Sequence, residues 1–367
     1  MNGHGLEIAF FGSSLVSAYW NGAATYYRGI IRALHQRRHR VTFYEPDAFE
    51  RQQHRDIDDP TWARVVVYPA TEAAALAAVE KARSADLVVK ASGVGVFDDL
   101  LEAAVLDLQG PGTMVAFWDV DAPATLERLD ADRDDPFAAL VPRYDLILTY
   151  GGGDPVVHAY QRRGARLCVP IYNAVDPTTH HPVEPQARFA ADLGFLGNRL
   201  PDREQRVEEF CLRAASLIGG ARVLLGGSGW QDKPRPANVA YVGHVYTRDH
   251  NAFNCSTKTV LNVSRDSMAR FGYSPATRVF EVAGAGACLI SDWWEGIEQF
   301  LEPEREILVA RDGAEVAAHV NATNWEKAAQ IGAAARRRVL AEHTYGHRAG
   351  ELQNVLGVAA ANIRAVA

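Results

Sequence analysis

The chain has 367 residues, of which 48% are hydrophobic and 23% charged, and its net charge at pH 7 is −7. A chain of this length exceeds one ordinary hydrophobic core and predicts two domains of roughly 180 residues each. The apolar fraction is that of a globular protein. The acidic balance argues against nucleic acid or an anionic membrane surface as the main partner.

The sequence favours a cytoplasmic protein with reduced thiols. No two of its four cysteines form a C-x-x-C pair, which gives no support for a zinc site: Cys168, Cys211, Cys255 and Cys288. No segment reaches the roughly 18 continuous apolar residues of a membrane span. The apolar run at 6–16 has no cationic leader and is broken at 12–14, so we interpret it as a strand and not as a secretory signal.

Strand-like and helix-like segments alternate through the first half of the chain. Helical stretches such as 23–38 and 71–85 separate the strand-like segments. Seven apolar runs predict buried strands: 6–12, 40–46, 63–69, 86–92, 113–121, 145–151 and 166–172. This alternation is typical of a doubly wound α/β domain with a parallel sheet.

The loop between the first strand and the first helix contains Ser13, Ser14, Asn21 and Gly22. At about ten residues it is longer than a β–α turn requires, which favours a functional role.

Two carboxylates, Asp119 and Asp121, end the strand predicted at 113–121. Ligands bind beyond the carboxyl ends of the strands in such sheets, so one of the two is a candidate general base that deprotonates a substrate hydroxyl. The alternative is that Asp121 caps the helix that Pro123 opens. We favour Asp119 for the chemistry.

The alternation stops at residues 173–190, a proline-containing segment without apolar periodicity that we interpret as a linker. The tail from Ala314 to Ala367 is predicted to be almost wholly helical. Between the two, six further runs predict strands: 192–198, 221–227, 238–244, 258–264, 287–292 and 306–310. The chain is thus predicted to form two α/β domains that face each other across a cleft.

A polar turn with two arginines follows the strand at 192–198 and enters a helix. Its candidate phosphate contacts are Gly197, Asn198, Arg199 and Arg203, although an arginine at a helix start is often only solvated.

A second turn, after the strand at 221–227, is rich in glycine. Gly226, Gly227 and Gly229 let the backbone approach a ligand. Trp230 either stacks against a base or is an ordinary core aromatic.

A short helix is predicted in the stretch 272–292, with Ser274 as its N-cap, Pro275 as its first residue and an end before Gly284. Ser274, Arg278 and Glu281 fall on one face of it. A helix N-terminus with a cation one turn in suits a diphosphate, and a carboxylate further along suits ribose hydroxyls. The alternative is an exposed Arg278–Glu281 pair.

The same stretch resembles GT-B glycosyltransferases of the group 1 type, most closely the spore-maturation CgeB-like branch. The matching run is S-P-x-x-R-x-F-E-x-x-x-x-G, from Ser274 to Gly286, followed by a strand that ends at Asp292. The segments LGFLGNRLPDREQRVEEF, VDPTTHHPV and EHTYGHRAGELQNVL are also similar to that branch. The resemblance covers most of residues 140–355.

The resemblance implies a GT-B fold made of two Rossmann-like doubly wound domains with a helical C-terminal tail. The implied bounds are 1–180 on the acceptor side, 187–345 around the nucleotide sugar, and a C-terminal helix at 346–367 that is expected to pack back on the N-terminal domain. It also implies metal-independent transfer of a sugar from a nucleotide diphosphate sugar, with UDP-sugar favoured as donor and no permanently bound cofactor.

The resemblance assigns roles to several candidates. Glu281 is implied to bind the ribose, and the backbone at Gly243 to meet the base. The loop with Ser13, Ser14, Asn21 and Gly22 is implied to lie beside the diphosphate and the acceptor. The nucleotide-sugar set comprises Gly197, Asn198, Arg199, Arg203, Gly227, Trp230, Gly243, Ser274, Arg278 and Glu281, with no metal ligand.

One departure from the family pattern leaves two alternatives open. Many relatives carry a second glutamate near the transferred sugar, at the position where this chain has Tyr273. The fold also suits a nucleotide-sugar epimerase, which needs no acceptor, and a non-catalytic sugar-nucleotide-binding protein of envelope or spore assembly.

Overall fold

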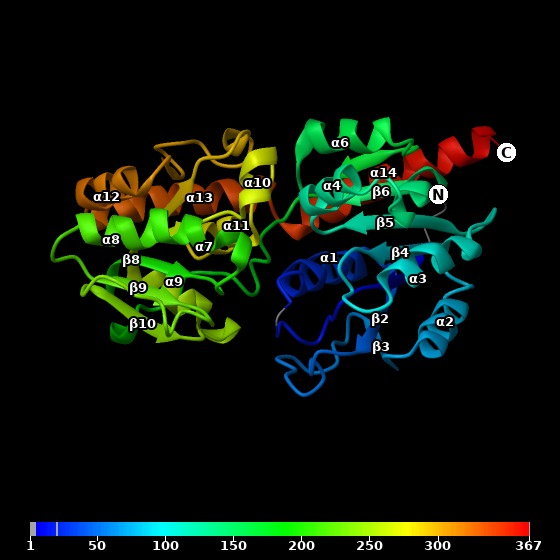
Figure 1. Ribbon diagram of the computed structural model, residues 1–367, viewed down its shortest axis with the longest axis horizontal. Coiled ribbons are helices and arrows are strands. Elements are labelled where there is room, and N and C mark those ends of the chain that lie inside the picture. Colours follow the sequence, from blue (N-terminus) through cyan, green and yellow to red (C-terminus); the bar gives the residue numbers. More distant parts are fainter. Residues whose placement is uncertain (1–4, 20, 367) are drawn as a thin grey trace. The chain divides into compact units, whose positions relative to one another are not determined.

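The computed structural model describes residues 5–19 and 21–366. The chain divides into two compact units (Figure 1): unit 1 comprises Met1–Tyr172 and Tyr345–Ala367, and unit 2 comprises Asn173–Thr344. These bounds differ at their ends from the domains expected from the sequence. His180 in particular belongs to unit 2.

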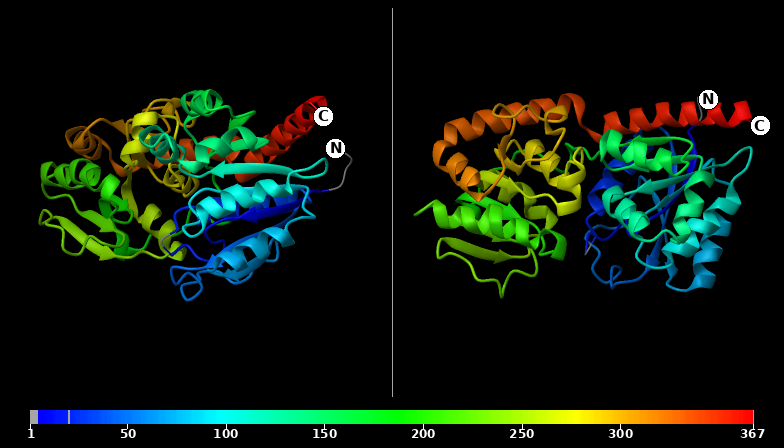
Figure 2. Two further views of the ribbon diagram at one scale, coloured as in Figure 1. Left: turned by 45° about the vertical axis from the view of Figure 1, so that its right-hand side comes forward. Right: turned by 45° about the horizontal axis from the view of Figure 1, so that its top comes forward.

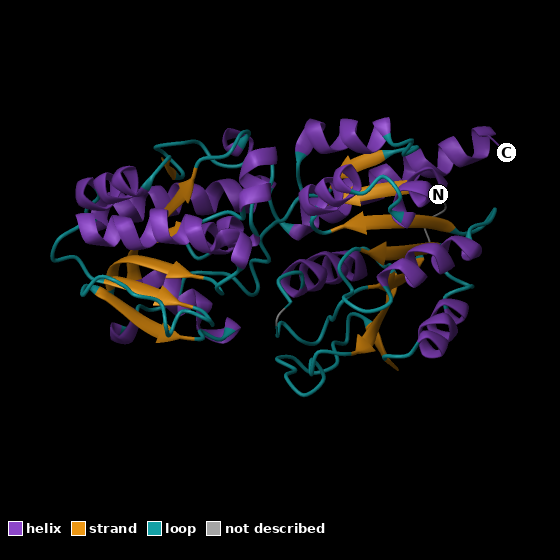
Figure 3. Ribbon diagram, viewed as in Figure 1, coloured by secondary structure: helices purple, strands orange, loops and turns teal. Residues whose placement is uncertain are grey.

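Unit 1 is built on a parallel sheet of seven strands in the order β3-β2-β1-β4-β5-β6-β7. Its strands are β1 (Glu7–Phe11), β2 (Arg40–Asp47), β3 (Arg64–Pro69), β4 (Leu87–Ala91), β5 (Met114–Asp119), β6 (Leu146–Thr149) and β7 (Cys168–Pro170). All seven predicted strands are confirmed. The inner strands β1, β4, β5 and β6 are buried because helices cover the sheet on both sides (Figure 3), whereas the edge strand β3 is mostly exposed or half-buried.

The handedness of the strand crossovers decides which face of the sheet each helix of unit 1 covers. The strand order reverses at β1, and right-handed connections therefore place α1 on one face and the helices after β3 on the other. The C-terminal helix α14, red in Figure 2, packs against α1. The helices are α1 (Ala24–Gln36), α2 (Glu72–Lys81), α3 (Asp98–Ala104), α4 (Ala122–Ala131), α5 (Pro136–Leu140), α6 (Gly153–Arg162) and α14 (Tyr345–Val366).

Unit 2 repeats this architecture with a parallel sheet of six strands in the order β10-β9-β8-β11-β12-β13. Its strands are β8 (Ala191–Leu196), β9 (Val223–Gly226), β10 (Val239–Gly243), β11 (Thr257–Asn262), β12 (Leu289–Asp292) and β13 (Leu308–Ala310). These six were also predicted. The order reverses between β8 and β11, which is where ligands bind in sheets of this kind.

Unit 2 carries its helices in two layers. The segment α7–η4–α8 packs with α12, whereas α11 packs with α13. The helices are α7 (Pro201–Val207), the π-helical η4 (Glu208–Arg213), α8 (Ala214–Leu217), α9 (His250–Ser256), α10 (Asp266–Phe271), α11 (Thr277–Gly284), α12 (Gly313–Ala322) and α13 (Trp325–Glu342). The helical tail is confirmed. In the described residues no helix is both long and apolar enough to cross a membrane.

The start of α11 corrects one expectation. The helix begins at Thr277, and its N-cap position is occupied by Ala276 in an extended conformation. Ser274 is therefore not the cap; its hydroxyl donates to the carbonyl of Gly272 at 2.9 Å. The chain is still extended at Ala276, whose ψ is 151°, so Pro275 is not the first helical residue and Ser274 lies two residues before the cap position.

Candidate functional site

Backbone hydrogen bonds tie together the turns at the carboxyl ends of three neighbouring strands of unit 2. The amide of Gly197, after β8, donates to Gly226 of β9 at 3.0 Å, and Gly227 donates to Gly243 of β10 at 2.8 Å. Arg199 donates to Ser228 at 2.9 Å. The predicted glycine turns therefore form one continuous rim.

Two glycines of this rim serve different purposes. Gly227 has a φ of 116°, and a Cβ there would lie 2.2 Å from the carbonyl oxygen of Gly197, so close backbone packing requires glycine. Gly243 has a φ of 71°, and a Cβ there would meet nothing within 4 Å. The first position is structural, whereas the second leaves space next to the backbone.

Trp230 and Asn198 support the rim from within. The indole Nε1 of Trp230 donates to the carbonyl of Gly197 at 2.8 Å, and its fully buried ring packs edge-on against Phe195. The Asn198 Oδ1 accepts from the amide of Ser228 at 2.9 Å. Of the two interpretations of Trp230, the geometry fits the core aromatic, since a fully buried ring has no face for a base.

Arg199 is engaged by acidic side chains. Its guanidinium lies 2.7 Å from Glu204 and 3.1 Å from Asp232. Hydrogen bonds from Arg199 and Lys233 lower the pKa of Glu204 to about 2. Among the predicted phosphate contacts, Arg199 is therefore already neutralised by protein partners.

Arg203 of α7 and Arg278 of α11 lie close enough to repel each other. Burial and the guanidinium of Arg278 lower the pKa of Arg203 to about 10. One donor of Arg203 bonds the carbonyl of Asn198 at 2.6 Å. Within residues 5–19 and 21–366, the buried Nε of Arg203 and Nη1 of Arg278 have no hydrogen-bond partner. Two converging cations with unused buried donors are what an anion site requires.

Glu281 lies beside these cations on α11 and is 5% exposed. Its Oε2 is 3.6 Å from Nη1 of Arg278, and its Oε1 is 3.7 Å from Nε2 of His180. No described residue donates a hydrogen bond to this carboxylate. Burial alone raises its pKa, but His180, Arg278 and His250 together lower it below the ordinary value. The side chain is thus a buried, ionised acceptor and not an exposed surface residue.

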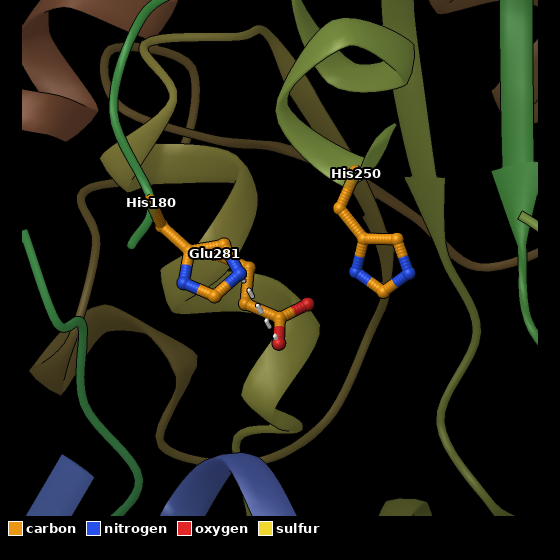
Figure 4. A group of neighbouring side chains, drawn as sticks. All are labelled: His180, His250 and Glu281. Atoms are coloured by element: carbon orange, nitrogen blue, oxygen red, sulfur yellow. Dashed lines mark ion pairs between the residues drawn. The ribbon is translucent and has the colours of Figure 1, made fainter. Parts of the chain in front are cut away.

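Two histidines complete the cluster (Figure 4). His180 comes from the irregular segment before β8, His250 opens α9, and one ligand atom from each lies within 4.8 Å of the others and of a Glu281 oxygen. Burial and Arg278 lower the pKa of His250 to about 4, so its imidazole is neutral near pH 7. Sequence analysis missed both histidines, because no periodicity links them to Glu281.

In unit 1 the side chains of the loop after β1 are tied to one another. The hydroxyl of Ser13 donates to Asn21 at 2.9 Å, and Asn21 donates to the carbonyls of Ser14 and Ser17. Ser14 donates to the buried carboxylate of Glu45 at 3.0 Å. Gly22 is exposed, and a Cβ there would meet nothing within 4 Å. The three polar residues therefore hold the loop, and Gly22 is its open point.

Asp119 lies at the end of β5 and is fully buried. Its carboxylate accepts hydrogen bonds from the side chains of Ser92 at 2.8 Å, Thr125 at 3.0 Å and Tyr160, and from the amide of Asp121 at 3.1 Å. Burial raises its pKa. In this arrangement the carboxylate of Asp119 is enclosed by protein donors, which does not fit the general base predicted from the sequence.

Asp121 is partly exposed and occupies the N-cap position of α4 without a capping hydrogen bond from its side chain. Of the two carboxylates predicted at the end of this strand, Asp121 is the more exposed, although its Oδ1 is buried.

Comparison with known proteins adds to this geometry. Residues 203–354 match the family model described as glycosyl transferase-like. A comparison with curated protein sequences finds no match.

Solved structures are similar over nearly the whole chain. HepE from Anabaena, in complex with UDP and glucose, has a TM-score of 0.68 at 14% identity and covers 96% of this chain and 100% of its own. Sucrose-phosphate synthase from Thermosynechococcus elongatus has a TM-score of 0.66 at 14% identity with the same coverage. An alpha-glucosyltransferase in complex with UDP-glucose and DNA containing an abasic site has a TM-score of 0.70 at 12% identity, again with that coverage.

The chain has the GT-B fold, and residues 203–354, most of which belong to unit 2, match the glycosyl transferase-like family model. At these identities the structural likeness shows the fold alone, whereas the family match covers Arg203, Arg278 and Glu281. Of the candidates predicted within the glycosyl transferase-like region, these three are brought together, and Trp230 lies apart in the core.

Proposed function

We propose that this GT-B protein is a glycosyltransferase that moves a sugar from a UDP-sugar to an acceptor hydroxyl without a metal ion. The family match and the fold support this proposal. The observation that carries it is the pair Arg203 and Arg278 beside the ionised Glu281: the buried Nε of Arg203 and Nη1 of Arg278 have no hydrogen-bond partner among the described residues. This arrangement suits a nucleoside diphosphate.

Each group has a role in binding the donor. The guanidinium groups of Arg203 and Arg278 would contact the diphosphate, together with the first backbone amides of α11, which have no partner within the helix. Glu281 would accept hydrogen bonds from the two ribose hydroxyls, and this suits a carboxylate that no described residue bonds. The open backbone at Gly243 leaves space for the base.

In the proposed reaction the bond between the anomeric carbon and the diphosphate oxygen breaks, and a bond to the acceptor oxygen forms. The diphosphate leaves as an anion, which the two guanidinium groups stabilise in place of a metal. The acceptor proton passes to a general base. Asp121 is our candidate for that base, with Asp119 holding the backbone of Asp121 through its amide.

The remaining assignments rest on the resemblance and on relatives. We propose that unit 2 binds the donor and unit 1 the acceptor, that the branch is CgeB-like, and that the protein acts in the cytoplasm. UDP is favoured because the similar structures of HepE and of the alpha-glucosyltransferase are complexes with UDP or UDP-glucose.

Calorimetric titration of UDP tests the proposal. We expect Glu281→Ala to weaken UDP affinity roughly 10- to 100-fold, since a hydrogen bond to a charged group contributes about 1.5–3 kcal/mol. Glu326→Ala, which changes an exposed glutamate of α13 in the same unit, is the matched control and should bind as wild type. Equal affinity in all three proteins would remove Glu281 from the site.

Incubation of a UDP-sugar with the protein and no acceptor separates transfer from its alternatives. Slow hydrolysis, followed by NMR, supports a transferase, whereas a new epimer of the sugar supports an epimerase. Tight binding without turnover, in any acceptor pool, would favour a binding protein.

A further inference from the structure

We propose that His180, His250 and Glu281 form a binding site for a divalent transition-metal ion of the zinc class. All three residues belong to unit 2, and one ligand atom from each lies within 4.8 Å of the others. Two imidazoles and one carboxylate are a donor set that Zn²⁺ accepts while keeping further coordination positions open. This inference departs from the sequence-based expectation of no metal ligand.

The tautomer of His180 follows from its neighbour. The hydroxyl of Thr179 donates its single proton to the carbonyl of Asp176 at 3.2 Å. Nδ1 of His180 lies 3.0 Å from the Thr179 hydroxyl oxygen, whose only proton is already donated, so Nδ1 is the donor of this hydrogen bond. In the neutral ring this leaves a lone pair on Nε2, the nitrogen that lies 3.7 Å from Oε1 of Glu281.

The tautomer of His250 follows in the same way. Its Nε2 lies 3.3 Å from the carbonyl oxygen of Val245, which can only accept, so the proton is on Nε2. Nδ1 then carries the lone pair. This nitrogen is buried, has no hydrogen-bond partner in the part of the chain that the structure describes, and is on the Glu281 side of the ring in Figure 4. An outer N–H bonded to a carbonyl is the usual support of a metal-binding histidine.

The Glu281 carboxylate is divided between two neighbours. Oε2 faces Arg278, whereas Oε1 faces His180. The lone pairs of His180, His250 and Glu281 therefore point toward one another. Such lone pairs repel one another unless a cation or hydrogen-bond donors lie between them. Arg278 reduces the attraction for a cation but leaves Oε1 available.

The distances permit a metal after small side-chain shifts. Bonds of about 2.1 Å in a tetrahedral site place ligand atoms about 3.4 Å apart. The 3.7 Å between Nε2 of His180 and Oε1 of Glu281 is close to this value, and the remaining separations are at most 4.8 Å.

The site also implies competition with the donor. The same oxygen of Glu281 cannot coordinate a metal and accept from ribose hydroxyls, so Zn²⁺ and UDP should exclude each other. This part rests on the proposed function, whereas the metal site itself does not.

Metal titrations of the full chain test the site. Free Zn²⁺ is set with a metal buffer, and binding to chelator-treated protein is measured. We expect His180→Gln and His250→Gln each to weaken Zn²⁺ affinity at least roughly 10-fold. His181→Gln changes the adjacent, exposed histidine and should bind as wild type. Equal weakening by all three variants, or no binding by wild type, would overturn the proposal.

A measurement on the wild type avoids dependence on variant folding. The electron paramagnetic resonance spectrum of bound Cu²⁺ should show coupling to two imidazole nitrogens. Coupling to none or to one contradicts the site.

Competition separates this inference from the proposed function. Saturating UDP should weaken Zn²⁺ binding, and Zn²⁺ should weaken UDP binding by the same factor, because coupling between two ligands is reciprocal. Glu281-dependent UDP binding without any Zn²⁺ binding overturns the metal site and leaves the proposed function standing. Zn²⁺ binding without UDP binding supports the metal site and overturns the proposed function.

Discussion

Two buried carboxylates, one in each unit, differ in what surrounds them. Asp119 of unit 1 accepts hydrogen bonds from three side chains and a backbone amide. Glu281 of unit 2 has cationic and imidazole groups at 3.6 and 3.7 Å but receives no hydrogen bond from the described residues. Both lie near the carboxyl edge of a parallel sheet, so their position in the fold does not explain why one is hydrogen-bonded and the other is not.

The difference teaches how to distinguish a structural charge from a functional one. A buried ion whose hydrogen-bonding capacity is filled by protein is part of the framework. A buried group that its neighbours keep ionised, but whose hydrogen-bonding positions are not filled by protein, is suited to bind a ligand. Membership of unit 2 does not explain why Glu281 lacks hydrogen bonds. The buried carboxylate of Asp292 is also in unit 2, and it accepts hydrogen bonds from Arg206 and Ser264.

The largest expected effect tests the framework role of Asp119. Asp119→Ala leaves four donors without their acceptor, and we expect it to lower the free energy of unfolding by about 3–4 kcal/mol in urea denaturation. UDP affinity should stay at the wild-type value. Asp107→Ala, at an exposed position of unit 1, is the control. A stable variant that has lost transfer activity would give Asp119 a chemical role and break the comparison.

The second effect concerns the cations beside Glu281. Arg278→Ala should weaken UDP binding by about 2–3 kcal/mol, the value for hydrogen bonds to charged groups, while uridine, which has no phosphate, binds with unchanged affinity. Arg305→Ala removes an exposed guanidinium of the same unit and should have no effect. Equal losses for UDP and uridine would place Arg278 away from the phosphates.

The third effect concerns Glu102, a further buried carboxylate, which has a cation nearby but is not kept ionised by it. Burial raises the pKa of Glu102 in unit 1 to about 7, although Lys90 lies 3.6 Å away and acts in the opposite direction. The unfolded chain loses this proton near pH 4.5 and the folded protein near 7, so stability falls as pH rises through that interval and is constant above it.

Glu102→Gln cannot ionise and should remove on the order of 2 kcal/mol of this pH dependence. Urea denaturation between pH 5 and 8 measures it, with Glu72→Gln, an exposed residue of α2, as the control. An unchanged slope in Glu102→Gln would mean that the folded protein ionises Glu102 as readily as the unfolded chain does.

The smallest effect tests Trp230. Trp230→Phe keeps an aromatic ring but loses the hydrogen bond to Gly197, and we expect a loss of about 1 kcal/mol in unfolding free energy. Uridine affinity should change little. A large loss of uridine affinity with unchanged stability would instead support contact with the base.

The sequence predicted the strands because parallel strands buried on both faces read as continuous apolar runs. It also singled out Arg203, Arg278 and Glu281, whose types suit an anion and a diol. It failed where tertiary partners decide the outcome. Arg199 resembles a phosphate contact until Glu204 and Asp232 are placed beside it.

The histidine cluster was not predictable, because His180 and His250 come from an irregular segment and a helix start that only the fold brings to Glu281. The same limit applied to α11, which begins at Thr277 and not directly after Ser274. The local sequence pattern predicts helices and strands, whereas the functional side-chain clusters depend on how distant segments pack together.

The placement of α14 has a consequence for biosynthesis. Unit 2 is one uninterrupted stretch of chain, whereas unit 1 needs its last helix, which packs on α1 and brings the Tyr345 ring against Gly29. A ribosome therefore releases every part of unit 2 before unit 1 can close. Until then the apolar side of α1 lacks its cover, and the earliest-made half of the protein is the last to be finished.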